Sequence, residues 1–137
     1  MGRILAIDYG IKRTGMAVTD PLQIIATALD TVDTKSAISY LKQYMIKEQV
    51  DELVIGLPKK LDNSDSEIAP LVKQFTEKLN KAFPSLRVYY VDERFTSKIA
   101  HRAMIDGGMK KKDRRDKANV DKISATLILQ TYLETKR

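Results

Sequence analysis

Residues 3–10 of the chain read RILAIDYG, a short apolar run that ends in an aspartate, a tyrosine and a glycine. A run of this length before a turn signal is typical of a buried strand. Residues 14–20, TGMAVTD, form a second run before Pro21, and the short basic link between the two runs predicts a β-hairpin. Asp8 then ends the first strand, and open α/β sheets commonly bind ligands just outside their strand ends.

The pattern after this hairpin changes from strand to helix. A β-leaning run at 24–32, rich in Thr, Ile and Val, predicts a third strand. Apolar residues then recur at helical spacing over 34–48, with Thr34 as a candidate N-cap. The continuous apolar run at 53–57, stopped by Pro58, indicates a strand that is buried on both faces and therefore central in its sheet.

The second half of the chain predicts three helices, one strand and a basic loop. The signals are a capping box, an apolar run after a proline, a glycine pair and a hydrophilic stretch without apolar periodicity. In order, the predicted elements are a helix from Ser64 to about Ala82, a strand at 86–91, a helix from Thr96 to Gly107, a loop at 109–117 and a helix at 119–134. The whole order, βββαβαβαα, predicts an α/β fold with helices on the faces of a sheet that contains an antiparallel strand.

Composition narrows the classes of function. With 137 residues the chain has the size of one domain, and we expect a single domain over residues 1–137. It has no cysteine and one histidine, which excludes a disulfide framework and a thiolate or multi-histidine metal site. No apolar run approaches the roughly 20 residues that span a bilayer, so we expect a cytoplasmic protein without a membrane segment. The net charge of +6 and the pI near 9.5 favour a polyanionic partner.

Three carboxylates stand where they could form one site. Asp8 ends the first strand, and Glu93 follows the last predicted strand. Asp121 falls on the apolar stripe of the last helix that must pack on the sheet. Each has an ordinary alternative explanation: a turn aspartate, a surface salt bridge with Arg94, or an aspartate favoured in a first helical turn. Together they suit Mg²⁺ or Mn²⁺, which prefer oxygen ligands, and two such ions can promote hydrolysis of a phosphodiester.

Four motifs follow one another along the chain. They are Ile7-Asp8-Tyr9-Gly10-x-Lys12-Arg13-x-Gly15, Ile55-Gly56-Leu57-Pro58, Asp92-Glu93-Arg94-Phe95-Thr96-Ser97 and Val120-Asp121-Lys122-x-Ser124-Ala125. Together, and over essentially the whole chain, they resemble the YqgF/RuvX family of ribonuclease H-like nucleases. The resemblance implies a mixed five-stranded sheet of order 3-2-1-4-5, with strand 2 antiparallel and helices on both faces. Family members are described as Holliday junction resolvases or as nucleases that mature the precursor of 16S ribosomal RNA.

The same resemblance implies the roles of individual residues. Asp8, Glu93 and Asp121 match the catalytic acids and would hold two divalent ions, Mg²⁺ or Mn²⁺. Family members carry basic residues close to the site, at positions that correspond here to Lys12, Arg13 and Arg94. Their expected partner is substrate phosphate, which arginine in particular can bind with two hydrogen bonds.

The sequence departs from the family pattern after Pro58, where it reads Lys59-Lys60 in place of the usual apolar or amide residues. These lysines add charge close to the predicted site. Arg114 and Arg115 in the basic stretch at 110–115 add more. We expect all four side chains to bind nucleic acid, with solvated surface charge as the alternative.

We therefore expect a metal-dependent phosphodiester hydrolase that acts on structured nucleic acid, foremost at the 5′ end of pre-16S rRNA. A Holliday junction resolvase acting on branched DNA is the alternative, and such an enzyme is expected to work as a two-fold dimer; monomer and homodimer both stay open. A non-catalytic nucleic-acid-binding accessory protein is a further alternative, because a carboxylate trio does not prove turnover. An actin-like ATPase or sugar kinase shares the Asp-x-Gly pattern but needs a second domain that 137 residues do not accommodate.

Overall fold

The computed structural model describes residues 2–57, 68–92 and 117–136, without the side chains of residues 117–122 and 136. Within these ranges, five strands form one sheet that packs against helices. The strands are β1 (Arg3–Asp8), β2 (Arg13–Thr19), β3 (Ala26–Asp33), β4 (Val50–Leu57) and β5 (Arg87–Asp92). The helices are the 3-10 helix η1 (Thr34–Ser36) and the α-helices α1 (Ala37–Lys47), α2 (Ala69–Ala82) and α5 (Lys117–Lys136).

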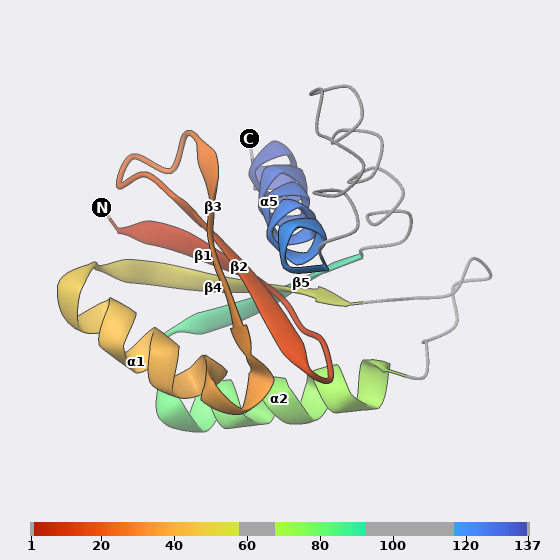
Figure 1. The fold of residues 1–137 in the computed structure, drawn as a ribbon. Helices are drawn as coiled ribbons and strands as arrows, with labels where there is room; N and C mark the ends of the chain where they lie inside the picture. Colours follow the sequence, from red (N-terminus) through yellow and green to blue (C-terminus); the bar gives the residue numbers. More distant parts are fainter. Residues whose placement is uncertain (1, 58–67, 93–116, 137) are drawn as a thin grey trace.

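The strand order is β3-β2-β1-β4-β5 (Figure 1), which confirms the predicted order 3-2-1-4-5. Strand β2 runs antiparallel to both of its neighbours, β1 and β3. Strands β1, β4 and β5 run parallel to one another. The two central strands, β1 and β4, have the fewest polar side chains, as expected for strands that are covered on both faces.

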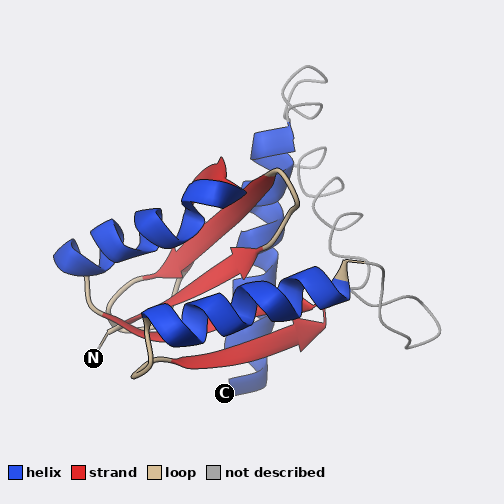
Figure 2. Ribbon diagram, turned by 90° about the horizontal axis from the view of Figure 1, so that it is seen from below, coloured by secondary structure: helices blue, strands red, loops and turns tan. Residues whose placement is uncertain are grey.

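Alternating side chains divide the sheet into two apolar faces. Leu5 and Ile7 of β1 pack against α1 and α2 on one side, which we call the α1/α2 face. Ile4 and Ala6 of the same strand pack against α5 on the other side, which we call the α5 face. Figure 2 shows α1 and α2 in front of the sheet and α5 behind it, so the predicted placement of helices on both faces is confirmed.

The two faces carry side chains of different size. Large residues such as Leu5, Ile7 and Met16 fill the α1/α2 face. Where α5 crosses the central strands, the fully buried contacts include Ala6 of β1, Ala17 of β2 and Ala125 of the helix. The distance between packed elements depends on the side chains at the contact, so these alanines allow α5 to lie close to the sheet.

Thr34 does not cap a helix, contrary to the sequence-based expectation. It belongs to η1, and the N-cap residue of α1 is Ser36, without a side-chain capping bond. The Thr34 hydroxyl instead donates a 2.6 Å hydrogen bond to the Gly10 carbonyl oxygen and lies 2.9 Å from the Thr14 hydroxyl. It therefore fixes the β1–β2 turn, a long-range role that the local sequence pattern does not reveal.

Other predicted ends shift by a few residues, as is usual for element boundaries. Strand β3 begins at Ala26, and α5 extends from Lys117 to Lys136. The capping box of Ser64 and Glu67, the predicted helix at 96–107 and the basic loop up to residue 116 lie outside the described residues. No helix in the described ranges is long and apolar enough to cross a membrane.

Candidate active site at the carboxyl edge of the sheet

The parallel strands β1, β4 and β5 end at the same edge of the sheet. Ile7 pairs with Ile55 near the end of the β1–β4 ladder, and Leu57 pairs with Asp92 at the end of the β4–β5 ladder. Asp8 is the next residue after Ile7 and is half-buried. Asp8 and the last residues of β4 and β5, Leu57 and Asp92, therefore lie along one edge of the sheet.

Strand alternation puts Asp8 on the α5 face. Ala6 is buried against α5, and Asp8 follows it by two residues along β1. Across the antiparallel ladder Asp8 pairs with Gly15 of β2, which has no side chain to cover it. The turn after Asp8 is tight, because a Cβ atom on Gly10 would collide with the Arg13 carbonyl oxygen. Gly10 thus permits the close return of the chain into β2.

Arg13 shares the α5 face with Asp8. It begins β2 and alternates with Gly15 and Ala17, and Ala17 is buried against α5. Lys12 lies in the turn with an exposed side chain, while its carbonyl oxygen accepts a 3.0 Å hydrogen bond from the Thr34 backbone N–H. The structure therefore brings one predicted phosphate-binding residue to the face of Asp8 and a second to the adjoining turn.

Helix α5 crosses the same face and is fixed near its C-terminal end. The Tyr132 hydroxyl donates a 2.6 Å hydrogen bond to Oε2 of Glu52, close to the start of β4. The Tyr132 ring also lies 5.6 Å from the Tyr89 ring of β5, centroid to centroid. Burial, reinforced by the hydrogen bond to Glu52, raises the pKa of Tyr132. The end of α5 thus sits over the beginnings of the parallel strands, and its earlier turns extend toward their carboxyl ends.

A comparison of lengths relates the beginning of α5 to the strand ends. From Tyr132 back to position 121 the helix axis covers about 17 Å, at about 1.5 Å per residue. From Glu52 to Leu57 strand β4 covers about 17 Å, at about 3.3 Å per residue. The two lengths are similar, so α5 is long enough to extend from the beginnings of the parallel strands toward the carboxyl edge, where β1 and β5 also end.

Much of the predicted site lies outside the described part of the chain. The predicted residues found there are Glu93, Arg94, Lys59, Lys60, Arg114 and Arg115. Asp121 is described as part of the α5 backbone, without its side chain. Among the residues that the structure describes, no group of three or more His, Cys, Asp or Glu side chains could hold a metal ion. The three-acid site stays a prediction, of which the structure positions Asp8 and the backbone that carries Asp121.

The hydrogen bond between Tyr132 and Glu52 has no signal in the sequence. Tyr132 is predictable as a member of the packing stripe of the last helix, and Glu52 as a polar residue at the start of a strand. Because 80 residues separate the two, no local pattern pairs them. The contact nevertheless helps to hold the C-terminal end of α5 on the sheet, together with the apolar packing of the helix.

Sequence comparisons match the chain to one family. A family model described as "RuvX: Holliday junction resolvase" matches residues 2–135. A protein of Bacteroides thetaiotaomicron named "Putative pre-16S rRNA nuclease" is 56% identical over 137 residues, which are 100% of this chain and 99% of that protein. A protein of the same name from Porphyromonas gingivalis is 52% identical over 134 residues, 98% of this chain and 97% of that protein.

Solved structures with a similar fold include RuvC of Thermus thermophilus. Its complex with Holliday junction substrate is similar with a TM-score of 0.58 at 18% sequence identity, covering 98% of this chain and 96% of that chain. A second RuvC structure gives a TM-score of 0.59 at 16% identity over the same shares of the two chains. Identities this low show a shared fold alone, and that fold confirms the predicted ribonuclease H-like class.

Proposed function

The chain belongs to the RuvX family of nucleases, and from this membership we propose that it is a metal-dependent phosphodiester hydrolase whose acids are Asp8, Glu93 and Asp121. The observation that carries the proposal is geometric. Asp8 ends β1 on the face of the sheet that α5 covers, and α5 is long enough for its first turns to extend toward the same edge. These positions support a shared site for two acids that are 113 positions apart in the sequence.

Glu93 is assigned to this site because it directly follows β5 in the sequence. The preceding part of that strand reaches the α5 face, where Val91 packs. The described strand ends at Asp92, and Glu93 itself lies outside the described residues. Its assignment therefore rests on the family motif Asp92-Glu93-Arg94 and on the place where β5 ends, at the same edge of the sheet as β1.

The donor set suits Mg²⁺ or Mn²⁺. All three proposed ligands offer carboxylate oxygen, and the sequence holds no cysteine and one histidine, so softer metals find no matching site. Carboxylates brought together repel one another, and divalent cations relieve that repulsion. When bound, a pair of such ions supplies an activated water and stabilisation of the leaving oxygen.

The residues of the chain hold and orient these partners. Asp8 is presented by a fully paired central strand, and its turn is tied to η1 by the hydrogen bond from Thr34 to Gly10. Rigid support of this kind keeps a ligand in its productive geometry. Arg13, on the same face, binds a substrate phosphate beside the acids. Further contacts to the nucleic acid backbone are assigned to Lys12, Lys59, Lys60, Arg94, Arg114 and Arg115.

We assign structured RNA as the substrate, with the 5′ end of pre-16S rRNA as the foremost target. The support is the name of relatives that are more than half identical over nearly their whole length. The description of the family model instead favours a branched DNA junction, which stays the second candidate. In either case the protein acts as a cytoplasmic single domain, as monomer or homodimer.

The test is cleavage of a labelled pre-16S rRNA fragment and a four-way DNA junction in parallel. Each is incubated with Mg²⁺, Mn²⁺ or chelator, using the wild type and Asp8→Asn. We expect metal-dependent cutting of the RNA that Asp8→Asn abolishes without loss of folding. Cutting of the junction alone would move the DNA assignment ahead, and binding of both without cleavage would favour the non-catalytic alternative.

A further inference from the structure

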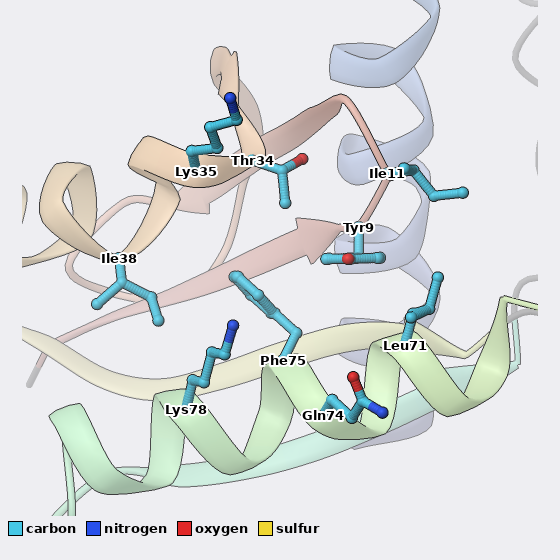
Figure 3. A pocket seen from close by; sticks show the side chains of 9 residues that line it. All are labelled: Tyr9, Ile11, Thr34, Lys35, Ile38, Leu71, Gln74, Phe75 and Lys78. Carbon is cyan, nitrogen blue, oxygen red and sulfur yellow. The ribbon is translucent and has the colours of Figure 1, made fainter.

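A pocket of about 290 Å³ lies on the α1/α2 face, on the opposite side of β1 from the candidate acids. It opens between η1 and the start of α1 on one side and α2 on the other (Figure 3). Its volume is at the small end of the range for ligand sites, below that of a typical drug pocket. The nine lining residues are Tyr9, Ile11, Thr34, Lys35, Ile38, Leu71, Gln74, Phe75 and Lys78.

The pocket combines aromatic and aliphatic surfaces with a cationic rim. The rings of Tyr9 and Phe75 are 5.1 Å apart and tilted by 46°, and Ile38 and Leu71 flank them. Lys35 and Lys78 stand on opposite sides, from η1 and α2. Among the residues that the structure describes, no Asp or Glu lines the pocket, so its chemistry favours an anion with a flat apolar body over a cation.

The two rim lysines are available for such a ligand. Neither Lys35 nor Lys78 forms an ion pair with any residue in the described ranges, and both side chains are exposed. Gln74 adds an amide with one acceptor and two donors, which suits the hydrogen-bonding edge of a base. Aromatic rings beside basic side chains are the usual means by which proteins hold unpaired nucleotides.

We propose that this pocket binds an unpaired nucleotide of the nucleic acid substrate, with the base against Tyr9 and the adjacent phosphate between Lys35 and Lys78. The inference rests on the proposed function, because the nucleotide would belong to the nucleic acid that is bound at the carboxyl edge of the sheet. Tyr9 directly follows Asp8, and the two point to opposite faces of the sheet. A nucleic acid strand that is bound at the acids reaches the pocket by passing over the β1–β2 turn. The substrate is then one with a single-stranded segment next to the cleavage position.

Methyl NMR of the wild-type protein in chelator tests occupancy without cleavage. A single-stranded RNA of about eight nucleotides is expected to shift the methyl resonances of Ile38 and Leu71. Ile46 of α1, which is 76% exposed and outside the pocket, serves as the control and stays in place. Free mononucleotide and inorganic phosphate are titrated in separate arms. Shifts with mononucleotide alone, or equal shifts at Ile46, would overturn the proposal.

A matched pair of double variants tests the lysines. Lys35→Ala/Lys78→Ala is compared with Lys42→Ala/Lys81→Ala, which removes two exposed lysines of α1 and α2 that do not line the pocket. Both variants lose the same charge, so a general electrostatic effect weakens them equally. We expect the pocket variant to bind the single strand about 10-fold more weakly than the control at the same salt concentration. Equal affinities would overturn the proposal.

The two proposals fail in different ways. Binding at the pocket without cleavage of any substrate would contradict the nuclease assignment but support nucleotide binding at the pocket. Cleavage that disappears in Asp8→Asn, together with unshifted Ile38 and Leu71 resonances, would support the nuclease assignment and contradict nucleotide binding at the pocket.

Discussion

Ala6→Val perturbs the contact between α5 and the sheet without touching a proposed catalytic group. Ala6 is fully buried with Ala17 and Ala125, two positions before Asp8 on the same face. Two added methyl groups have no free space there, so the helix must move or the side chain must leave its preferred rotamer. Overpacking of this kind costs about 1–3 kcal/mol, and we expect the free energy of unfolding in urea to fall by that amount. A displacement of about 1 Å at the site would lower cleavage about 100-fold.

Ala28→Val is the control for this variant. Ala28 belongs to β3 and is exposed, so the same substitution adds the same group to a strand without overpacking. Stability is read from urea unfolding and activity from cleavage of the RNA fragment. If Ala6→Val matches Ala28→Val in both measurements, the close contact of α5 with β1 is not what positions the site.

Three further predictions follow from single contacts. Tyr132→Phe removes the hydrogen bond to Glu52 and should lower the free energy of unfolding by about 1 kcal/mol at neutral pH, whereas Tyr90→Phe, at an exposed ring, should not. The folded-state pKa of Tyr132 is raised above the unfolded value near 10, so this stabilisation is present below about pH 10 and is lost as the pH rises further. If the free energy of unfolding of the wild type and of Tyr132→Phe falls equally above pH 10, the assignment is contradicted. Gly10→Ala should cost about 1–3 kcal/mol in urea unfolding because its Cβ collides with the Arg13 carbonyl oxygen, and wild-type stability would show that the turn has room. Lys59→Ala/Lys60→Ala should reduce the slope of log K against log salt by about 2 in a nucleic acid binding titration, and an unchanged slope would remove both lysines from the interface.

The sheet was largely predictable because its signals are local. The runs at 3–10, 14–20 and 53–57 each identify a strand by apolar content and a turn residue, and β1 and β4 prove to be adjacent and central. The resemblance to a family supplied the strand order. The N-cap role of Thr34 was wrong because the hydroxyl is used for a contact with Gly10, which lies 24 residues away in the sequence.

The place of Asp8 was predictable, because a strand end and a turn coincide there. The stripe position of Asp121 stays a prediction, since its side chain lies outside the described part of the chain. The packing around the candidate site was not predictable, because it depends on contacts between distant parts of the chain. The small size of Ala6 and Ala125, which lets α5 approach the sheet, has meaning only once the two are known to face each other. The rim lysines of the pocket, Lys35 and Lys78, likewise belong to separate elements and share no motif.

The central claim is that Asp8, Glu93 and Asp121 form one metal site. Its most direct test is a Mn²⁺ binding titration in which electron paramagnetic resonance measures the free ion. The variants are Asp8→Asn, Glu93→Gln and Asp121→Asn, with Asp92→Asn as the matched control at the end of β5. If the three acids form one site, each of their variants binds Mn²⁺ at least about 10-fold more weakly than the wild type, while Asp92→Asn binds as the wild type does. Wild-type affinity in Asp8→Asn, or an equal loss in Asp92→Asn, would contradict the account.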